Sequence, residues 1–274
     1  MLTRPQIKQI AKERFQGAYW PSVGAYAVVL GIALGVSMFN FLPILGFISL
    51  AASIIIVALG VGQSGFYLNV YRGESAPRVG QVFEITFTQN FGRKLGGMLW
   101  MELFLFLWAL PASVVFPVSF LISGIIASTA QLNAASLDSG PPYLGWFAFN
   151  DTFLAGLAMT VLLTLLAFIP VFIKSLSYSM TPYILADCPN VPAQKALTLS
   201  KRMTRGNKGE IFVMMLSFLG WCMLSAFTVG LLDIFWTTPY MSLSLAGQYD
   251  ELKRRALENG TVTLAELEGT PDVI

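Results

Sequence analysis

Long apolar segments that lack charged side chains are the feature that most constrains how this chain can fold. Residues 21–42 contain no Asp, Glu, Lys or Arg, and several later stretches are as apolar. A helix of about 20 apolar residues is long enough to cross a bilayer. Charged residues make up only 12% of the 274 residues, whereas soluble domains carry about 25%. We therefore predict an all-α, polytopic transmembrane helical bundle.

Charged and turn-forming residues divide the apolar sequence into about six predicted spans. Their approximate bounds are 21–42, 44–68, 95–117, 152–178, 211–228 and 231–249. Asn40 and Pro43 mark a tight turn between the first two spans. The third apolar run continues to about Ala130, which is too long for one straight crossing, and Pro111 and Pro117 are expected to kink or divide it.

The positions of Lys and Arg predict the orientation of the chain. These residues cluster at 4–14, 72–94, 195–208 and 253–255, and the turns on the other side contain none. Because positively charged loops stay on the cytoplasmic side, six crossings with both termini inside satisfy every cluster, whereas five would put 253–255 outside. The membrane domain is thus predicted to cover 1–249, and 250–274 to form an exposed, acidic cytoplasmic tail.

Three basic amphipathic helices are predicted to lie along the membrane surface between the hairpins. Their approximate bounds are 5–17, 77–91 and 192–205, and each has a proline near its start. In the first helix Ile7, Ala11 and Phe15 share one face, which is the spacing of an interfacial helix. The order of surface helix, span out and span back indicates a possible three-fold internal repeat. The alternative is that any hairpin membrane protein places Pro, Gly and Tyr at its boundaries.

The ends of two even-numbered spans share a Thr-Pro-Tyr sequence. The residues are Thr181, Pro182 and Tyr183 in one copy and Thr238, Pro239 and Tyr240 in the other. We interpret both copies as hinges, where a span ends at the inner interface and the chain turns onto the lipid surface. This interpretation favours an architectural role over binding of a specific ligand.

Basic residues on and beside the surface helices are candidate contacts for lipid headgroups. They are Lys8, Lys12, Arg14, Arg93, Lys94, Lys201, Arg202, Arg205 and Lys208. A basic residue near an anionic inner leaflet contributes about 1 kcal/mol to membrane binding. Nucleic acid is not an expected partner, because these charges are needed for topology. We leave open whether the chain also binds a membrane-protein partner or a second copy of itself.

Glu102 and Lys174 are ionisable residues inside predicted spans. Each lies about two turns from the cytoplasmic end of its span, so the two have similar predicted depth. Because an unpaired charge in the membrane is costly, we predict an ion pair between them. The pair could belong to a polar pathway for an ion or a lipid headgroup. It could equally be a packing contact, or Lys174 could extend to the interface alone.

The residue inventory disfavours most catalytic and cofactor chemistry. The chain has no histidine, and its two cysteines, Cys188 and Cys222, do not form a disulfide framework. The glycines of 60–65 match a dinucleotide-binding fingerprint on paper, but neither a strand nor a βαβ unit surrounds them. Close helix packing is the better interpretation, as it is for Gly31 and Gly35. We predict no catalytic residue, no cofactor and no metal site.

Three stretches carry a resemblance to a known family. They are Ser179-Met180-Thr181-Pro182-Tyr183-Ile184-Leu185-Ala186-Asp187-Cys188-Pro189-Asn190, Ser200-Lys201-Arg202-Met203 with Gly206-Asn207-Lys208, and Leu216-Ser217-Phe218-Leu219-Gly220-Trp221. On these residues the chain resembles domain-of-unknown-function family 975, a family of bacterial membrane proteins common in Gram-positive bacteria. The resemblance extends over about residues 1–255 and departs at Cys188, where members typically carry Asn. It implies a multi-pass protein of the bacterial cytoplasmic membrane, without assigned catalytic residues.

These observations favour a non-enzymatic membrane protein of unknown activity. We expect it to act in lipid interaction, in envelope homeostasis or as an accessory to a membrane partner. An alternative is a transporter or lipid translocator for a small or amphiphilic substrate, which would need a polar cavity reaching the membrane midplane. A second alternative is an intramembrane enzyme, which the lack of histidine and of a paired-carboxylate motif disfavours.

Overall fold

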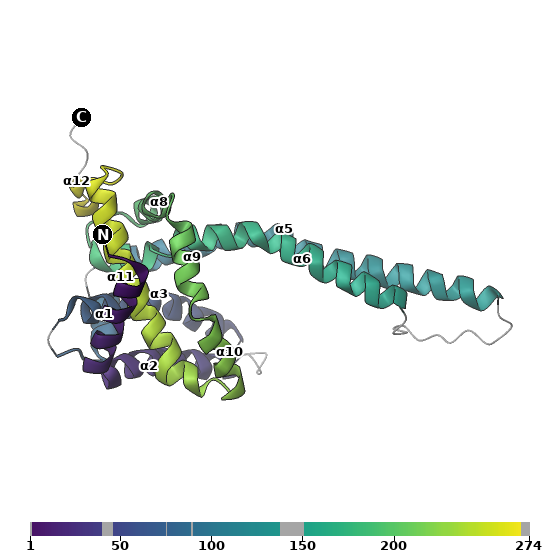
Figure 1. Cartoon of the computed structure of the whole chain (residues 1–274), viewed down its shortest axis with the longest axis horizontal. Helices are drawn as coiled ribbons and strands as arrows, with labels where there is room; N and C mark the ends of the chain where they lie inside the picture. Colours follow the sequence, from purple (N-terminus) through teal and green to yellow (C-terminus); the bar gives the residue numbers. More distant parts are fainter. Residues whose placement is uncertain (1, 40–45, 75, 89, 138–150, 270–274) are drawn as a thin grey trace. The chain divides into compact units, whose positions relative to one another are not determined.

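The computed structural model describes residues 2–39, 46–74, 76–88, 90–137 and 151–269. The predicted turn at Asn40 and Pro43 and the loop 138–150 lie outside these residues. Every regular element in the described part of the chain is a helix, which confirms the all-α prediction (Figure 1). The helices are α1 (Arg4–Gly17), α2 (Tyr19–Met38), α3 (Gly46–Arg72), α4 (Gln81–Phe87), α5 (Phe91–Leu137), α6 (Asp151–Tyr178), α7 (Thr181–Asp187), α8 (Ala193–Thr204), α9 (Lys208–Leu216), α10 (Leu219–Phe227), the π-helix η2 (Asp233–Thr237), α11 (Thr238–Glu258) and α12 (Leu264–Glu268).

Five helical segments in the described residues are long and apolar enough to cross a membrane. They are Tyr19–Met38, Ala52–Arg72, Phe91–Thr129, Thr152–Asp187 and Lys208–Phe227. By length and composition the chain is thus a multi-pass membrane protein. The predicted sixth span, 231–249, is not among the five, because its residues belong to η2 and to α11, and α11 continues into a charged segment. Six crossings and the three-fold repeat stay predictions.

The chain divides into two compact units. Unit 1 comprises Met1–Glu102 and Leu176–Ile274, and unit 2 comprises Leu103–Ser175. Within unit 1, α3 packs against α2, α4, α7 and α11, and α11 also packs against α1, α8, α9 and η2. The core of unit 1 includes the fully buried side chains of Phe66, Tyr67, Leu243 and Tyr249. Burying one such large apolar side chain stabilises the fold by about 1.5–3 kcal/mol.

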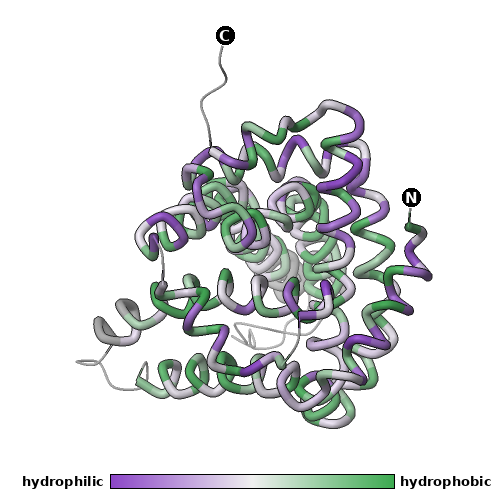
Figure 2. Tube along the Cα trace, turned by 90° about the vertical axis from the view of Figure 1, so that its left-hand side faces the viewer, coloured by the Kyte–Doolittle hydropathy of each residue, from purple (hydrophilic) through white to green (hydrophobic). Residues whose placement is uncertain are grey.

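The first predicted surface helix matches α1 closely, and its apolar face packs on protein. Ile7, Ala11 and Phe15 are almost completely buried, while the residues between them are largely exposed. Figure 2 shows the resulting alternation of hydrophilic and hydrophobic residues along the helix that begins at the N-terminus. α8 likewise buries its predicted apolar residues Ala196 and Leu197. α4 is shorter than the predicted helix 77–91. The position of these helices along a membrane surface stays a prediction.

Close packing explains part of the glycine pattern in residues 60–65. A Cβ atom added at Gly62 would overlap with Thr86 Oγ1 and Val82 O of α4, so only glycine lets the two helices approach so closely. The packing interpretation is thereby supported at this position. At Gly31 and Gly35 no described atom lies within 4 Å of an added Cβ, so the same prediction is wrong for that pair among the described residues.

The prediction of an exposed tail is wrong for part of residues 250–269, although Glu258 and the residues just after it are exposed. α11 continues without a break to Glu258, and Leu252, Ala256 and Leu267 are buried. The sequence pattern of acids near bases suggested solvation, but the acids Glu251 and Glu266 are also buried and bind arginines. The last helix, α12, begins with a capping box, in which Thr263 accepts a hydrogen bond from the Glu266 backbone N–H.

Unit 2 consists of one pair of helices, formed by parts of α5 and α6. α5 passes through Pro111 and Pro117 without ending, although we expected these prolines to kink or divide it. Its candidate span Phe91–Thr129 has 39 residues, about 58 Å at 1.5 Å per residue, compared with a hydrocarbon thickness of about 30 Å. Ser123 Oγ donates to Gly156 O at 3.0 Å, across the α5–α6 contact. Most large apolar side chains in the described part of unit 2 are exposed, as expected for a helix surface that contacts lipid.

Candidate functional site

A groove of about 550 Å³ lies between α1 and α9 in unit 1. Arg4, Lys8 and Lys12 of α1 form one wall of the groove, and α9 with the following residue Ser217 forms the other, where Val213 supplies exposed apolar surface and Met214 lies buried beneath it. Tyr240 of α11 also lines it. The groove therefore combines a basic wall and an apolar wall, which is the chemistry of a site for an anionic amphiphile.

The sequence of α1 places its basic residues on one stripe. Arg4, Lys8 and Lys12 are spaced by four residues, so their side chains are neighbours along the helix surface. The buried residues Ile7, Ala11 and Phe15 lie on the face of α1 next to this stripe and attach the helix to the rest of unit 1. Tyr240 fixes the helix further, because its hydroxyl donates to Lys8 O at 3.2 Å. The basic stripe is thus held by a rigid support.

Lys8 reaches across the groove from one wall to the other. Its Nζ donates to Ser217 Oγ at 3.0 Å and lies 4.4 Å from the centre of the Phe218 ring. The cation–π contact and the hydrogen bond compensate part of the lost hydration. Burial lowers the pKa of Lys8 from its ordinary value of 10.5. Arg4 and Lys12 lie at more exposed positions on the same stripe.

The three basic residues of the groove lie close together and form no salt bridge with a described carboxylate. None of the salt bridges among the described residues involves Arg4, Lys8 or Lys12. Five other cations do bind acids within the protein, namely Arg72, Arg202, Lys253, Arg254 and Arg255. The groove is therefore a place where positive charge gathers without internal compensation, which favours binding of an anion.

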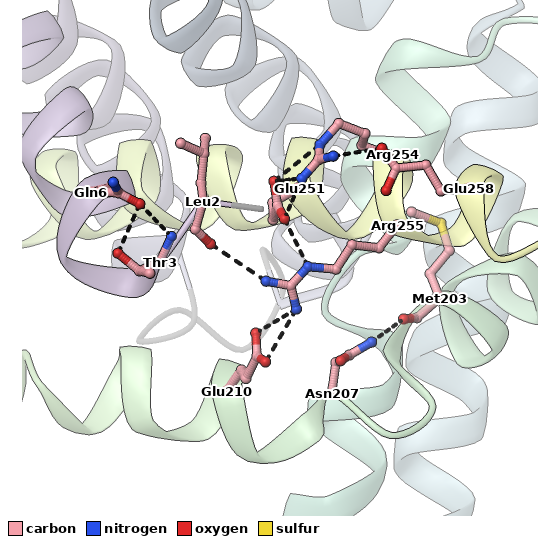
Figure 3. Close-up of polar contacts among 10 residues, drawn as sticks. All are labelled: Leu2, Thr3, Gln6, Met203, Asn207, Glu210, Glu251, Arg254, Arg255 and Glu258. Carbon is pink, nitrogen blue, oxygen red and sulfur yellow. Dashed lines mark hydrogen bonds and ion pairs between the residues drawn. The ribbon is translucent and has the colours of Figure 1, made fainter.

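A cluster of charged residues joins the starts of the two groove walls (Figure 3). We call it the clasp and define it as Leu2, Glu210, Glu251, Arg254 and Arg255. Arg255 lies at its centre: Nε donates to Glu251 Oε1 at 2.8 Å, Nη1 to Glu210 Oε2 at 3.0 Å, and Nη2 to Leu2 O at 3.4 Å. Leu2 immediately precedes α1, and Glu210 lies in the first turn of α9. One guanidinium thus connects α11 to the beginning of both walls.

Glu251 is the buried acid that anchors the clasp. Its side chain is 1% exposed and also accepts from Arg254 Nη2 at 2.7 and 2.8 Å. Burial by itself raises the pKa of Glu251, but the hydrogen bonds from Arg254 and Arg255 outweigh this effect, so the pKa lies below its ordinary value of 4.5. Glu251 is therefore ionised at neutral pH, and the two arginines compensate its charge.

A second charge network surrounds Asp187, at the end of α7. Its carboxylate accepts from Arg72 Nη1 at 2.6 Å, from Lys253 Nζ at 2.6 Å and from the Tyr249 hydroxyl at 2.9 Å. Arg72 also binds Asp250 at 2.6 Å. Because every one of these groups has a partner inside the protein, the network connects α3, α7 and α11 and presents no uncompensated charge for a ligand.

The predicted lipid contacts lie in several different environments. Lys8 and Lys12 line the groove, while Arg14 and Arg205 are exposed away from it. Lys94 is 5% exposed and donates to the carbonyls of Ile85 and Thr88, so its ammonium is enclosed by protein. Arg93 donates to the carbonyl oxygens of Leu185 and Val191, and Arg202 binds Glu266. The ammonium of Lys201 lies over the Tyr178 ring, and Lys208 is half-buried at the start of α9.

The predicted ion pair between Glu102 and Lys174 has one partner in each unit and stays a prediction. Within unit 2, Lys174 Nζ lies 4.4 Å from the centre of the Trp108 ring, a cation–π contact that the sequence did not indicate.

Both predicted hinges coincide with helix starts, because Thr181 begins α7 and Thr238 begins α11, each with proline in the first turn.

Three functional candidates, Arg4, Glu251 and Arg255, were not predicted from the sequence. Arg4 belongs to the first basic cluster, and its spacing to Lys8 and Lys12 was a usable signal. Glu251 and Arg255 were assigned to an exposed tail, and no local pattern indicates that they bind residues of α9 and the N-terminal segment.

Comparison with known proteins gives one match. The family model described as "Protein of unknown function (DUF975)" matches residues 1–256, which confirms the resemblance deduced from the residues around Thr181. No curated protein and no solved structure matches the chain.

Proposed function

The chain belongs to the DUF975 family of proteins of unknown function, and on that basis we propose that it is a non-enzymatic membrane protein that binds anionic lipid headgroups in the groove between α1 and α9. The observation that carries the proposal is the basic stripe of Arg4, Lys8 and Lys12, which forms no salt bridge with the acids that the structure describes and faces an apolar wall. A phosphate group would bind the stripe, and an acyl chain would lie along the exposed side chain of Val213.

The place of the groove along the chain supports lipid as the source of the anion. α1 leads directly into the candidate span Tyr19–Met38, and α9 begins the candidate span Lys208–Phe227. In the predicted topology both spans start at the cytoplasmic side, so the groove lies at the inner interface of the cytoplasmic membrane. Anionic headgroups are concentrated there, and each basic residue near them contributes about 1 kcal/mol.

The contact between Lys8 and Ser217 resembles a serine–lysine catalytic pair, but its hydrogen bonds favour a structural role. Ser217 Oγ donates to Met214 O at 2.6 Å, so its proton points to the backbone and it accepts from Lys8. A nucleophilic serine would instead donate its proton to an uncharged lysine. This arrangement, together with the absence of histidine from the sequence, underlies the non-enzymatic part of the proposal.

The test compares the lipids retained by two triple variants with matched charge loss. One variant carries Arg4→Gln, Lys8→Gln and Lys12→Gln. The control variant carries Arg78→Gln, Lys195→Gln and Arg205→Gln, which remove three positive charges outside the groove. Native mass spectrometry after extraction from bacterial membranes measures the bound lipid. We expect wild type and control to retain phosphatidylglycerol and the groove variant to lose it.

Equal retention by the groove variant and the control would refute the proposal. Inorganic phosphate added at increasing concentration separates lipid from free phosphate as the source of the anion. If millimolar phosphate replaces the lipid completely, the apolar wall contributes nothing and the ligand is a soluble anion. If phosphatidylglycerol stays bound, the acyl chain takes part in binding, as proposed.

A further inference from the structure

The clasp provides the only charged connection, among the described salt bridges, between α9 and α11. It is the pair of Arg255 and Glu210, with Nη1 within 3.1 Å of both carboxylate oxygens. The same guanidinium donates to the Leu2 carbonyl just before α1. The groove walls begin at these two points, since Arg4 follows Leu2 by two residues and Val213 follows Glu210 by three. The clasp therefore lies where it controls the distance between the walls.

Only an arginine can make all three connections at once. Its planar guanidinium directs Nε, Nη1 and Nη2 to different acceptors, here Glu251, Glu210 and Leu2. A lysine ammonium is a single point charge and does not reproduce this fork. The side chain of Arg255 is 14% exposed and that of Glu251 is 1% exposed, so this contact is largely shielded from water and salt, whereas Glu210 is 39% exposed and its contact with Arg255 is open to solvent on one side.

Arg254 stabilises the clasp without touching either wall. It binds Glu251 three residues before it and Glu258 four residues after it, both on α11. It therefore helps to keep Glu251 ionised and oriented toward Arg255, while its own contacts remain within one helix. Arg254 therefore belongs to the clasp, and the matched control is Arg78, an exposed arginine outside both the clasp and the groove.

From this geometry we infer that Arg255 is a positioning residue for the groove. It fixes the spacing of α1 and α9 and thereby sets the affinity for an anionic headgroup, although it does not line the groove. The inference rests on the proposed function for the identity of the ligand. It adds that α11, through Arg255, regulates the affinity of the groove for that ligand. Weakening the clasp opens the walls, and the basic stripe and the apolar wall then no longer contact one ligand together.

The experiment measures the distance between the walls and the lipid affinity in the same variants. Spin labels are attached at Gln9→Cys and Val213→Cys, which line opposite walls, in a Cys222→Ser background. The full-length chain is placed in nanodiscs of phosphatidylcholine with increasing phosphatidylglycerol. In Arg255→Gln we expect a broadened, longer distance distribution and a lipid affinity lower by about tenfold, the effect of losing one charge-assisted contact. In Arg78→Gln, which removes an arginine outside both the groove and the clasp, we expect both measurements to match wild type.

Two outcomes overturn the inference. The first is an unchanged distance distribution in Arg255→Gln. The second is a broadened distribution with unchanged affinity for phosphatidylglycerol. If Arg255→Gln does not fold, Glu210→Gln removes only the connection to α9 and is judged by the same two outcomes. Loss of affinity in Arg255→Gln without loss in the groove variant of Arg4, Lys8 and Lys12 would refute the proposed site itself, so the two failures are distinguishable.

Discussion

The substitution Gly62→Ala tests the packing of α3 on α4 most sharply. A Cβ atom at position 62 would overlap with Thr86 Oγ1 and Val82 O, and the latter is backbone that cannot rotate away. The overlap would also disturb the hydrogen bond from Thr86 Oγ1 to Val82 O, which is 2.7 Å long and buried. Overpacking of this kind costs about 1–3 kcal/mol, and a lost buried hydrogen bond about 1 kcal/mol.

Gly60→Ala is the matched control on the same helix. Its added Cβ would lie 3.7 Å from Met98 Cε, which is an ordinary van der Waals contact. Replacing a helical glycine with alanine favours the helix by about 1 kcal/mol, and both variants receive this gain. We therefore expect Gly60→Ala to be neutral or slightly stabilising and Gly62→Ala to be destabilised by about 1–3 kcal/mol relative to it.

Thermal unfolding in mild detergent, followed by tryptophan fluorescence, measures the difference between the two variants. A lower unfolding temperature for Gly62→Ala than for Gly60→Ala is the expected result. If the two variants unfold at the same temperature, helix packing does not explain the glycines of residues 60–65. The reasoning that assigns this segment to helix contact would then be wrong.

Three further predictions concern charge and topology. The pKa of Glu251 is lowered from 4.5 in the folded state, so the ionised carboxylate contributes its full stabilisation above about pH 4.5. This contribution is lost as the pH falls through the folded-state pKa. Acid unfolding of Glu251→Gln should therefore depend less on pH in this range than acid unfolding of the wild type. Asp187→Asn should destabilise the fold by about 1–3 kcal/mol in chemical denaturation, whereas Asp250→Asn should have a smaller effect because Arg72 keeps Asp187. A cysteine at the exposed Glu258 should react with an impermeant thiol reagent only after the membrane is opened; labelling of intact cells would contradict a cytoplasmic C-terminus.

Amphipathic periodicity made part of the fold predictable from the sequence. The predicted helix 5–17 corresponds to α1, Arg4–Gly17, and its face of Ile7, Ala11 and Phe15 is buried as the spacing indicates. Long apolar runs likewise indicated most of the candidate spans. These features are local, because they depend on residues within a few helical turns.

The errors arose where distant residues decide the structure. The sixth span, 231–249, stays a prediction, because α11 packs against other helices of unit 1 and continues as the same helix into charged residues, which the sequence did not indicate. The sequence shows that Arg255 and Glu210 are charged. It does not show that these residues, 45 positions apart, are partners. The groove was missed for the same reason, since its second wall is supplied by α9.

Photo-crosslinking at Gln9 tests the central claim most directly, because this residue lines the groove. A photoreactive amino acid at this position is irradiated in liposomes that contain equal amounts of labelled phosphatidylglycerol and phosphatidylcholine. We predict preferential capture of phosphatidylglycerol, which is lost when Arg4, Lys8 and Lys12 are replaced by glutamine. Equal capture of the two lipids by the wild-type groove would contradict the claim that it binds anionic headgroups.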